Sequence, residues 1–281
     1  MADGPMPVWF GVLSLVVLLL MVDAWRRIIV RKRRGRPIVS RRRRRPVPWG
    51  IEGANLAFAF VGLTLLAALA SADANEEPAG AVGFADAVVF ATTWAVLSAV
   101  SLAWIGSRHD LRLADFGLPV TTHEAARDAM LGLSACTVAL LPVYGVQMLL
   151  VWGIGVPSSH PTVEALLADP SWELIVAATL MAVVIAPIFE ELAFRVLLQG
   201  GLERYAGRRA CWPIAVSSTV FAMAHVGQGW APVPLFVVAI VLGYLYRQTH
   251  RIMPIIVMHM AFNALSLAAA IATAQVTGAA T

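Results

Sequence analysis

Two adjacent carboxylates lie inside an apolar segment of this 281-residue chain, Ala186-Pro187-Ile188-Phe189-Glu190-Glu191-Leu192-Ala193-Phe194-Arg195. A charged side chain in the middle of a bilayer costs about 3 kcal/mol on insertion scales, so such residues usually face a protein interior or a water-filled cavity. Glu191 and Arg195 are four residues apart and can form an ion pair on one helix face. Glu190 points about 100° away and lacks that partner. We therefore expect one ion-paired carboxylate and one that can accept a proton from water.

Pro187 lies three residues before this pair. It has no N–H to donate, so we expect it to kink the helix just ahead of the two carboxylates. A buried Glu–Arg pair that only holds two helices together would explain Glu191 and Arg195 equally well. It would leave Glu190 unexplained.

Two further polar clusters are predicted at a similar depth. Phe221 and His225 are four residues apart in the next apolar segment, and His259 and Asn263 are four residues apart in the last one. At 1.5 Å per residue, Glu190 and His225 each lie roughly 20 Å from the cytoplasmic ends of their helices. A lone histidine in a membrane helix is more often a helix–helix hydrogen bond than a catalyst. Three clusters on three helices favour one converging site.

The composition predicts that lipid surrounds these segments. The chain is 59% hydrophobic and 14% charged, and its mean hydropathy is +0.75. A soluble domain needs roughly a quarter of its residues charged. We therefore expect an all-α, polytopic membrane helical bundle of about eight transmembrane helices, with spans near 8–25, 51–71, 82–106, 129–153, 174–200, 212–227, 231–247 and 253–275.

Positive charge predicts the orientation of the bundle. All 21 Lys and Arg residues fall on alternate connections between these spans, and twelve of them lie between Arg26 and Arg45. Since basic connections stay in the cytoplasm, both termini are predicted to be non-cytoplasmic. The Arg26–Arg45 loop is expected to lie on anionic lipid headgroups rather than to bind nucleic acid or another partner.

Tryptophan positions agree with these spans, because amphipathic rings prefer the membrane interface. Eight tryptophans are predicted at span ends: Trp9, Trp25, Trp49, Trp104, Trp152, Trp172, Trp212 and Trp230.

The polar segment His109–Asp128 divides the chain into two predicted parts. Residues 1–128 would hold three N-terminal transmembrane helices with the Arg-rich loop (26–48). Residues 129–281 would form the membrane core that carries the polar clusters.

The ordered motifs Glu-Glu-x-x-x-Arg, Phe-x-x-x-His and His-x-x-x-Asn resemble the CPBP family, which includes type II CAAX prenyl endopeptidases and bacteriocin-processing enzymes. The resemblance covers about residues 173–275, and the matching residues are Glu190, Glu191, Arg195, Phe221, His225, His259 and Asn263. Val196 departs from the pattern, since the family commonly has Gly after the Arg; this concerns packing more than chemistry. The resemblance implies a CPBP-type core in the C-terminal half.

The resemblance also implies a glutamic intramembrane endopeptidase that cleaves a membrane-associated protein or peptide. In that picture Glu190, helped by His225, deprotonates the attacking water. His259 and Asn263 donate hydrogen bonds to the oxyanion, and Glu191, held by Arg195, shapes the site. No cofactor is expected. The mechanistic alternative is a catalytic zinc ion, because Glu190, Glu191, His225 and His259 are suitable ligand types, although the close His spacing of zinc-protease helices is absent.

Two other functional classes stay open. A non-proteolytic member of the same fold, such as a bacteriocin-immunity or scaffold protein, would more often have lost some of these polar residues. A small proton-coupled transporter would use them as a relay, but no internal repeat supports it. The Ala- and Arg-rich composition suggests a high-GC bacterium and its cytoplasmic membrane; a eukaryotic endoplasmic reticulum with prenylated substrates is the alternative.

Overall fold

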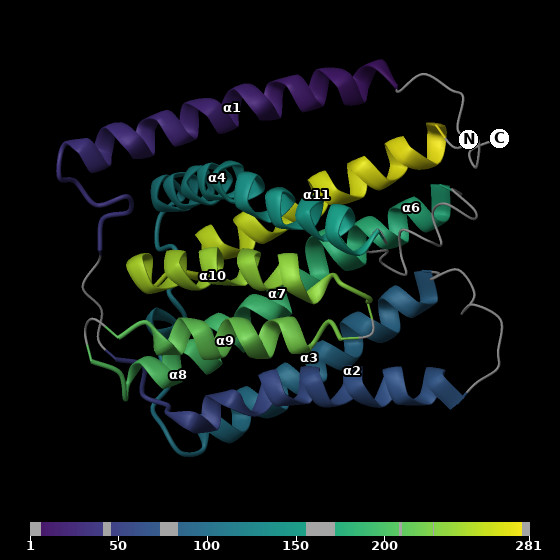
Figure 1. Cartoon of the computed structure of the whole chain (residues 1–281). Coiled ribbons are helices and arrows are strands. Elements are labelled where there is room, and N and C mark those ends of the chain that lie inside the picture. The colour runs from purple at the N-terminus through teal and green to yellow at the C-terminus, as the bar shows by residue number, and fades with distance from the viewer. Residues whose placement is uncertain are drawn as a thin grey trace.

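The protein is described by a computed structural model that covers residues 7–41, 46–73, 84–155, 172–207, 210–226 and 228–276. All regular elements in these ranges are helices, so the all-α class is confirmed (Figure 1). Seven are single α-helices: α1 Val8–Arg33, α2 Asn55–Asp73, α3 Phe84–Gly106, α4 Thr122–Ile154, α9 Trp212–Met223, α10 Pro232–Thr249 and α11 Ile252–Val276. Short 3₁₀ turns, η1 (Ile51–Ala54) and η2 (Leu113–Phe116), precede α2 and α4.

The remaining helical rod runs from residue 172 to residue 203 and changes type along its length. It consists of α6 (Trp172–Ala178), the π-helical η3 (Thr179–Ile185), α7 (Ala186–Glu190), the π-helical η4 (Glu191–Gln199) and α8 (Gly200–Glu203). The two π-helical segments lie on either side of the short helix that begins with Ala186 and Pro187. The distortion expected at Pro187 is therefore a change of helix type rather than a simple kink.

The lengths of the helices fit a multi-pass membrane protein. In the described chain, six helices are long and apolar enough to cross a bilayer, and two shorter apolar helices, Ile51–Leu66 and Trp212–Met223, accompany them. The polytopic membrane bundle is thus confirmed as the fold. Large apolar side chains are exposed along these helices, which suits contact with lipid.

Successive rods run in opposite directions (Figure 1). Consequently the C-terminal ends of α1, α3, α8 and α10 lie at one end of the bundle. It is here called the basic end, because Arg34, Arg112, Arg204 and Arg251 follow these helices in the chain. The start of α1 and the end of α11 lie at the opposite end. This alternation is the one that eight passes require.

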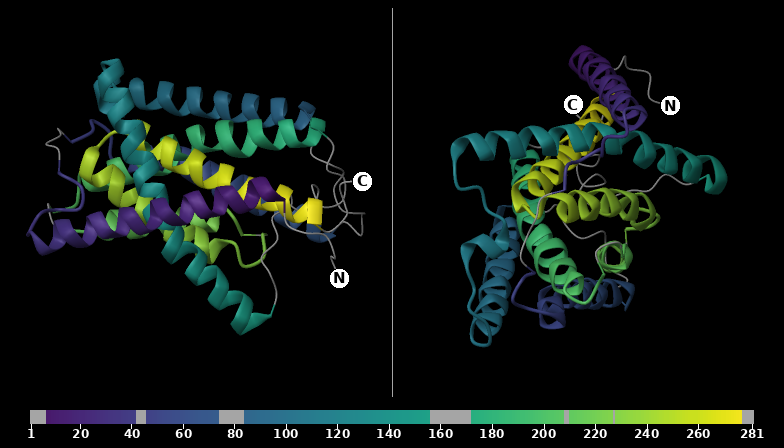
Figure 2. Two further views of the ribbon diagram at one scale, coloured as in Figure 1. Left: turned by 90° about the horizontal axis from the view of Figure 1, so that it is seen from above. Right: turned by 90° about the vertical axis from the view of Figure 1, so that its left-hand side faces the viewer.

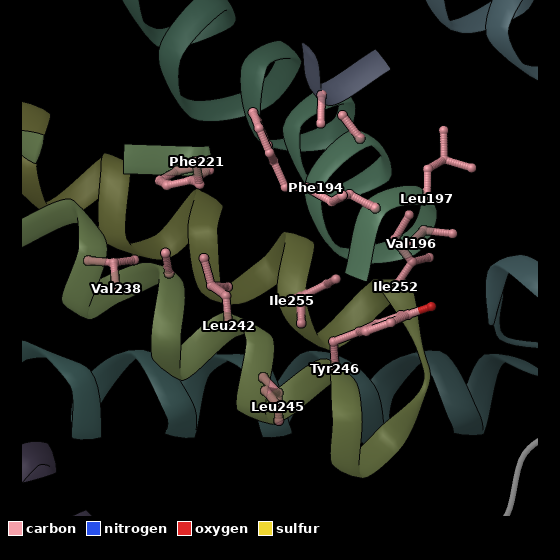
Figure 3. Close-up of a cluster of buried hydrophobic side chains, with 14 of the residues drawn as sticks. Phe194, Val196, Leu197, Phe221, Val238, Leu242, Leu245, Tyr246, Ile252 and Ile255 are labelled. Carbon is pink, nitrogen blue, oxygen red and sulfur yellow. The ribbon is translucent and has the colours of Figure 1, made fainter. Parts of the chain in front are cut away.

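The core is built around η4. Phe194, Val196 and Leu197 of η4 pack in one buried cluster with residues of α9, α10 and α11 (Figure 3). The labelled partners are Phe221, Val238, Leu242, Leu245, Tyr246, Ile252 and Ile255. Because η4 touches α2, α9, α10 and α11, its polar residues Glu191, Arg195 and Gln199 are buried within the protein.

Trp49 lies just before η1 and α2, at a span end as expected, but its side chain packs inside the protein. Its side chain is completely buried, and its indole Nε1 donates a hydrogen bond to the Leu197 carbonyl at 3.1 Å. Gly53 approaches the same carbonyl so closely that a Cβ there would lie 2.5 Å from the oxygen. The segment that ends the Arg-rich loop therefore packs into the core, where the Trp49 indole N–H has the Leu197 carbonyl as its acceptor.

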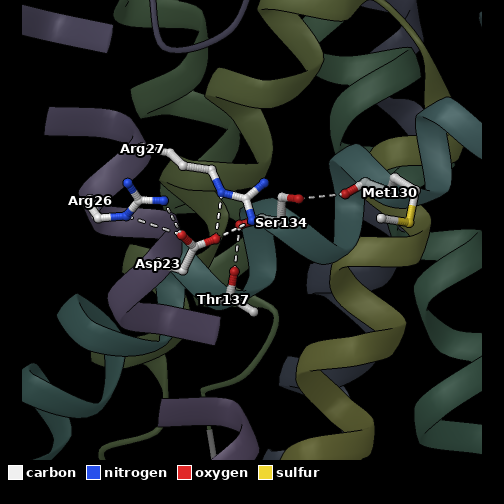
Figure 4. Close-up of polar contacts among 6 residues, drawn as sticks. All are labelled: Asp23, Arg26, Arg27, Met130, Ser134 and Thr137. Carbon is white, nitrogen blue, oxygen red and sulfur yellow. Dashed lines mark hydrogen bonds and ion pairs between the residues drawn. The ribbon is translucent and has the colours of Figure 1, made fainter. Parts of the chain in front are cut away.

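Helix α1 lies on the outside of the bundle against α4 and α11 (Figure 2) and buries none of its residues. Its Asp23 forms ion pairs with Arg26, at 2.8 Å, and with Arg27, whereas the Trp25 Nε1 has no hydrogen-bond partner within the described chain. On the facing helix α4, Ser134 and Thr137 donate to backbone carbonyls of their own helix (Figure 4). No polar bond between the two helices is needed to hold them together.

The expected division at residues 128 and 129 falls inside α4, and the buried cluster contains residues from both sides of it, among them Phe60 and Phe194. The division into two parts stays a prediction.

Candidate active site

The change of helix type beside Pro187 leaves a backbone carbonyl to which Asn263 can bond. The Ala186 N–H bonds to the Met181 carbonyl in the π-helical pattern, so it does not reach Ala182 as an α-helix would require. The next donor in a π-helix would be residue 187, which is proline and has no N–H. The Ala182 carbonyl is left without a donor from its own helix, and the Asn263 Nδ2 of α11 donates to it at 2.7 Å.

Glu191 is the anchored carboxylate. Its side chain is fully buried, and its Oε1 lies 3.4 Å from the Arg195 Nη1 and 2.8 Å from the His259 Nδ1. Because a carboxylate only accepts, the His259 ring must carry a proton on Nδ1. Glu191 thus fixes both the ring orientation and the tautomer of His259.

Glu190 lies on the other side of the same imidazole. Its Oε2 is 3.7 Å from the His259 Nε2, and its side chain retains 12% exposure. This distance is too long for a direct hydrogen bond. The two nitrogens of His259 therefore face one carboxylate each, with Glu191 bonded and Glu190 close but unbonded.

Arg195 has no exposed surface and lies beneath the Phe221 ring, with its guanidinium carbon 4.4 Å from the ring centroid. Its Nε, Nη1 and Nη2 make no hydrogen bond within the described chain. The buried Arg195 charge is stabilised instead by the Glu191 charge and by the face of the Phe221 ring, which attracts a cation most strongly when water is absent.

His225 does not lie on the transmembrane helix where it was expected. Helix α9 ends at Met223, and His225 occupies the following turn. Its Nδ1 donates to the Phe221 carbonyl at 2.9 Å, which leaves Nε2 without the ring proton in the neutral form. The centroid of the Phe221 ring lies 4.8 Å from that of His225 and 5.8 Å from that of His259.

The structure thus brings Glu190, Glu191, Arg195 and His259 into direct contact, and places His225 beside them across the Phe221 ring. Neither His225 nor Asn263 bonds directly to Glu190 among the residues that the structure describes.

The same geometry bears on whether these side chains could hold a metal ion. Across the described ranges, no group of three or more His, Cys, Asp or Glu side chains is arranged so that it could hold a metal ion. The site residues therefore do not fit a zinc centre of three protein ligands.

One segment of the chain matches a known protein family. Residues 171–265 match the family described as type II CAAX prenyl endopeptidase Rce1-like. The resemblance to the CPBP family is confirmed. All six polar residues of the site lie inside the Rce1-like segment, whereas α1, α2, α3 and α4 lie outside it. The match indicates a membrane endopeptidase of the CAAX-protease type. No curated protein and no solved structure matches the chain.

Sequence reasoning missed two contacts of the Rce1-like segment. The bond from Asn263 to Ala182 depends on a carbonyl that only the π-helical register leaves free. The stacking of Arg195 under Phe221 joins residues from two helices. The one signal in the sequence for the first contact was Pro187, which has no N–H to donate to a carbonyl in the preceding turn, such as that of Ala182.

Proposed function

We propose that the protein is an intramembrane endopeptidase in which Glu190 is the general base. The observation that carries this proposal is the asymmetry of the two carboxylates around His259. Glu191 is buried and its Oε1 contacts both Arg195 and His259, although its Oε2 has no hydrogen-bond partner within the described chain. Glu190 keeps some exposure and has no direct hydrogen bond within the same part of the chain. A general base needs an accessible lone pair and a partner that can share the proton.

In the proposed reaction, a water contacts both the Glu190 Oε2 and the His259 Nε2, whose separation allows one molecule to touch both. Glu190 takes a proton from this water, and the hydroxide attacks the scissile carbonyl carbon. The C–N bond then breaks, and the proton held by Glu190 passes to the leaving amine.

The other residues stabilise charge or hold the base in place. The donors proposed for the oxyanion are the second N–H of the Asn263 amide and the His259 Nε2, which donates while the ring carries a proton on both nitrogens. His225, whose Nδ1 is bonded to Phe221, offers Nε2 for proton exchange with the substrate. Arg195 and Glu191 act by positioning His259.

The test compares membrane proteomes and purified protein in liposomes for the wild type and Glu190→Gln. The amide keeps the shape and removes the base, so we expect cleavage of a true substrate to fall by 100-fold or more, on the order of the contribution of a general base. Glu173→Gln removes an exposed carboxylate from α6 of the same rod and serves as the matched control. Unchanged cleavage by Glu190→Gln would refute the assignment.

The substrate class proposed is a membrane-associated protein or peptide, since the site lies within the bundle. We further propose that the basic end faces the cytoplasm of a bacterial cell, with both termini on the opposite side of the cytoplasmic membrane. Reporter fusions after Arg36 and after Val276 should give opposite signals. Equal signals would contradict this topology.

A further inference from the structure

A pocket of about 240 Å³ lies at the basic end of the bundle, where the end of the Arg-rich loop meets the ends of α8 and α10. Its charged lining comes from three separate parts of the chain: Arg41 of the loop, Glu203 and Arg204 at the end of α8, and Arg247 and His250 at the end of α10. No residue of the candidate active site lines it.

The charge of the lining is strongly one-sided. Three guanidinium groups against one carboxylate leave a formal charge of +2 with His250 neutral. The carboxylate is itself engaged, since the Glu203 Oε1 accepts from the Gln199 Nε2 at 2.9 Å and its Oε2 lies 3.7 Å from the His250 Nδ1. The described lining is therefore positive, and its one carboxylate contacts Gln199 and His250.

Two of the guanidinium groups are held in place by backbone carbonyls. Arg204 donates to the Pro48 carbonyl, and Arg247 donates to the Ala210 carbonyl. A guanidinium has five N–H donors, so the bond to Pro48 orients the Arg204 side chain without using all of its donors. Arginines fixed in this way have lost part of their rotamer freedom before a ligand arrives, which favours anion binding.

We propose that this pocket binds a phosphate group carrying two negative charges. Arginine forks match phosphate oxygens with paired hydrogen bonds, and a charge of −2 would neutralise the lining. A volume of about 240 Å³ also leaves room for bridging waters at about 30 Å³ each. The phosphate source is either a lipid headgroup, since basic pockets on the cytoplasmic side of helical bundles bind such groups, or a soluble phosphate.

The pocket is separate from the proposed catalytic chemistry. Glu190 and Arg204 are fourteen residues apart on nearly continuous helix, which corresponds to roughly 20 Å at 1.5 Å per residue. Phosphate binding can therefore be measured on the Glu190→Gln protein, where we expect it unchanged. A failure of the phosphate-binding proposal can then be distinguished from a failure of the peptidase assignment.

The experiment uses the full chain in nanodiscs of phosphatidylcholine with a small fraction of phosphatidic acid, whose headgroup is a phosphate monoester. Native mass spectrometry counts the bound phosphatidic acid, and a titration gives its Kd. We expect Arg204→Gln to weaken binding about tenfold or more, the effect of losing one charge-assisted contact. Arg36→Gln removes one exposed arginine of the same loop that does not line the pocket, and it should bind like the wild type. Arg247→Gln is the second pocket variant, and thermal unfolding checks that each variant is folded.

Soluble competitors identify the source of the phosphate. Displacement of the lipid by millimolar inorganic phosphate would support a site for the phosphate group alone, and resistance to it would support a lipid headgroup site. Equal competition by acetate would overturn the proposal, because a carboxylate would then suffice. Equal weakening by Arg36→Gln and Arg204→Gln would also overturn it, since only diffuse attraction would remain.

Discussion

Removal of the buried Arg195 charge gives the sharpest test of how the site is held together. The side chain has no exposed surface, one ionic partner in Glu191 at 3.4 Å and the Phe221 face at 4.4 Å. Arg195→Met keeps most of the aliphatic volume and removes the charge. The Glu191 carboxylate then remains buried with His259 as its one polar neighbour in the described chain.

Breaking one side of a buried ion pair typically costs about 3–5 kcal/mol of unfolding free energy, because the other charge stays uncompensated. Loss of the desolvated cation–π contact is worth about 2 kcal/mol and is part of that total. In the double variant Arg195→Met/Glu191→Gln, the amide oxygen can still accept from His259 and no charge is stranded. We therefore expect the double variant to be about 2–3 kcal/mol more stable than the sum of the two single effects.

Unfolding free energies can be measured by titrating the purified protein in mixed micelles with a denaturing detergent and following tryptophan fluorescence. Glu173→Gln, on the exposed end of the same rod, controls for general loss of a carboxylate. Strict additivity of the single variants would refute the reasoning, because the two groups would then not be energetically coupled.

Four further outcomes are expected. Asn263→Leu leaves the Ala182 carbonyl without its donor, so unfolding free energy should fall by about 1–3 kcal/mol; an unchanged denaturation midpoint would contradict this. The His109 Nε2 lies 2.7 Å from the Glu52 Oε1 in a half-buried pair, so Glu52→Gln should lower the unfolding free energy by about 0.5–1.5 kcal/mol; a melting temperature equal to that of the wild type would count against this. A Cβ on Gly201 would lie 2.1 Å from the carbonyl oxygen of Gly50, so G201A should lower the unfolding free energy by about 1–3 kcal/mol, measured by thermal unfolding. Cleavage of a substrate should persist after treatment with a zinc chelator; its loss, restored by zinc, would indicate a metal mechanism.

Sequence alone went far toward the fold because lipid imposes simple rules. Backbone polar groups in a bilayer must be satisfied within the protein, which a helix does almost entirely by itself, so long apolar runs such as that of α11 could be assigned as helices directly. The C-terminal end of the short helix α9 was harder to predict from the sequence. Its apolar pattern continues to residue 227, yet the helix ends at Met223, and nothing in the composition marks that end.

Trp49 shows the limit of such rules. An indole between a basic loop and an apolar run is typical of a membrane interface, but here it is buried and bonded to the Leu197 carbonyl. The approach depends on Gly53, which leaves space beside that carbonyl. Contacts between segments almost 150 residues apart, as these are, have no local signature.

The chain itself determined that charged and polar side chains would be drawn together, since burying each of them alone in hydrocarbon is too costly. It also determined which residues these were, through their four-residue spacings on separate helices. Only the tertiary structure decided how Glu190 and Glu191 share one imidazole, with Glu191 accepting the hydrogen bond from Nδ1 and Glu190 facing Nε2 at 3.7 Å. That division arises because α11 packs against a rod whose π-helical turns change the direction of each side chain by an amount that residue spacing does not reveal.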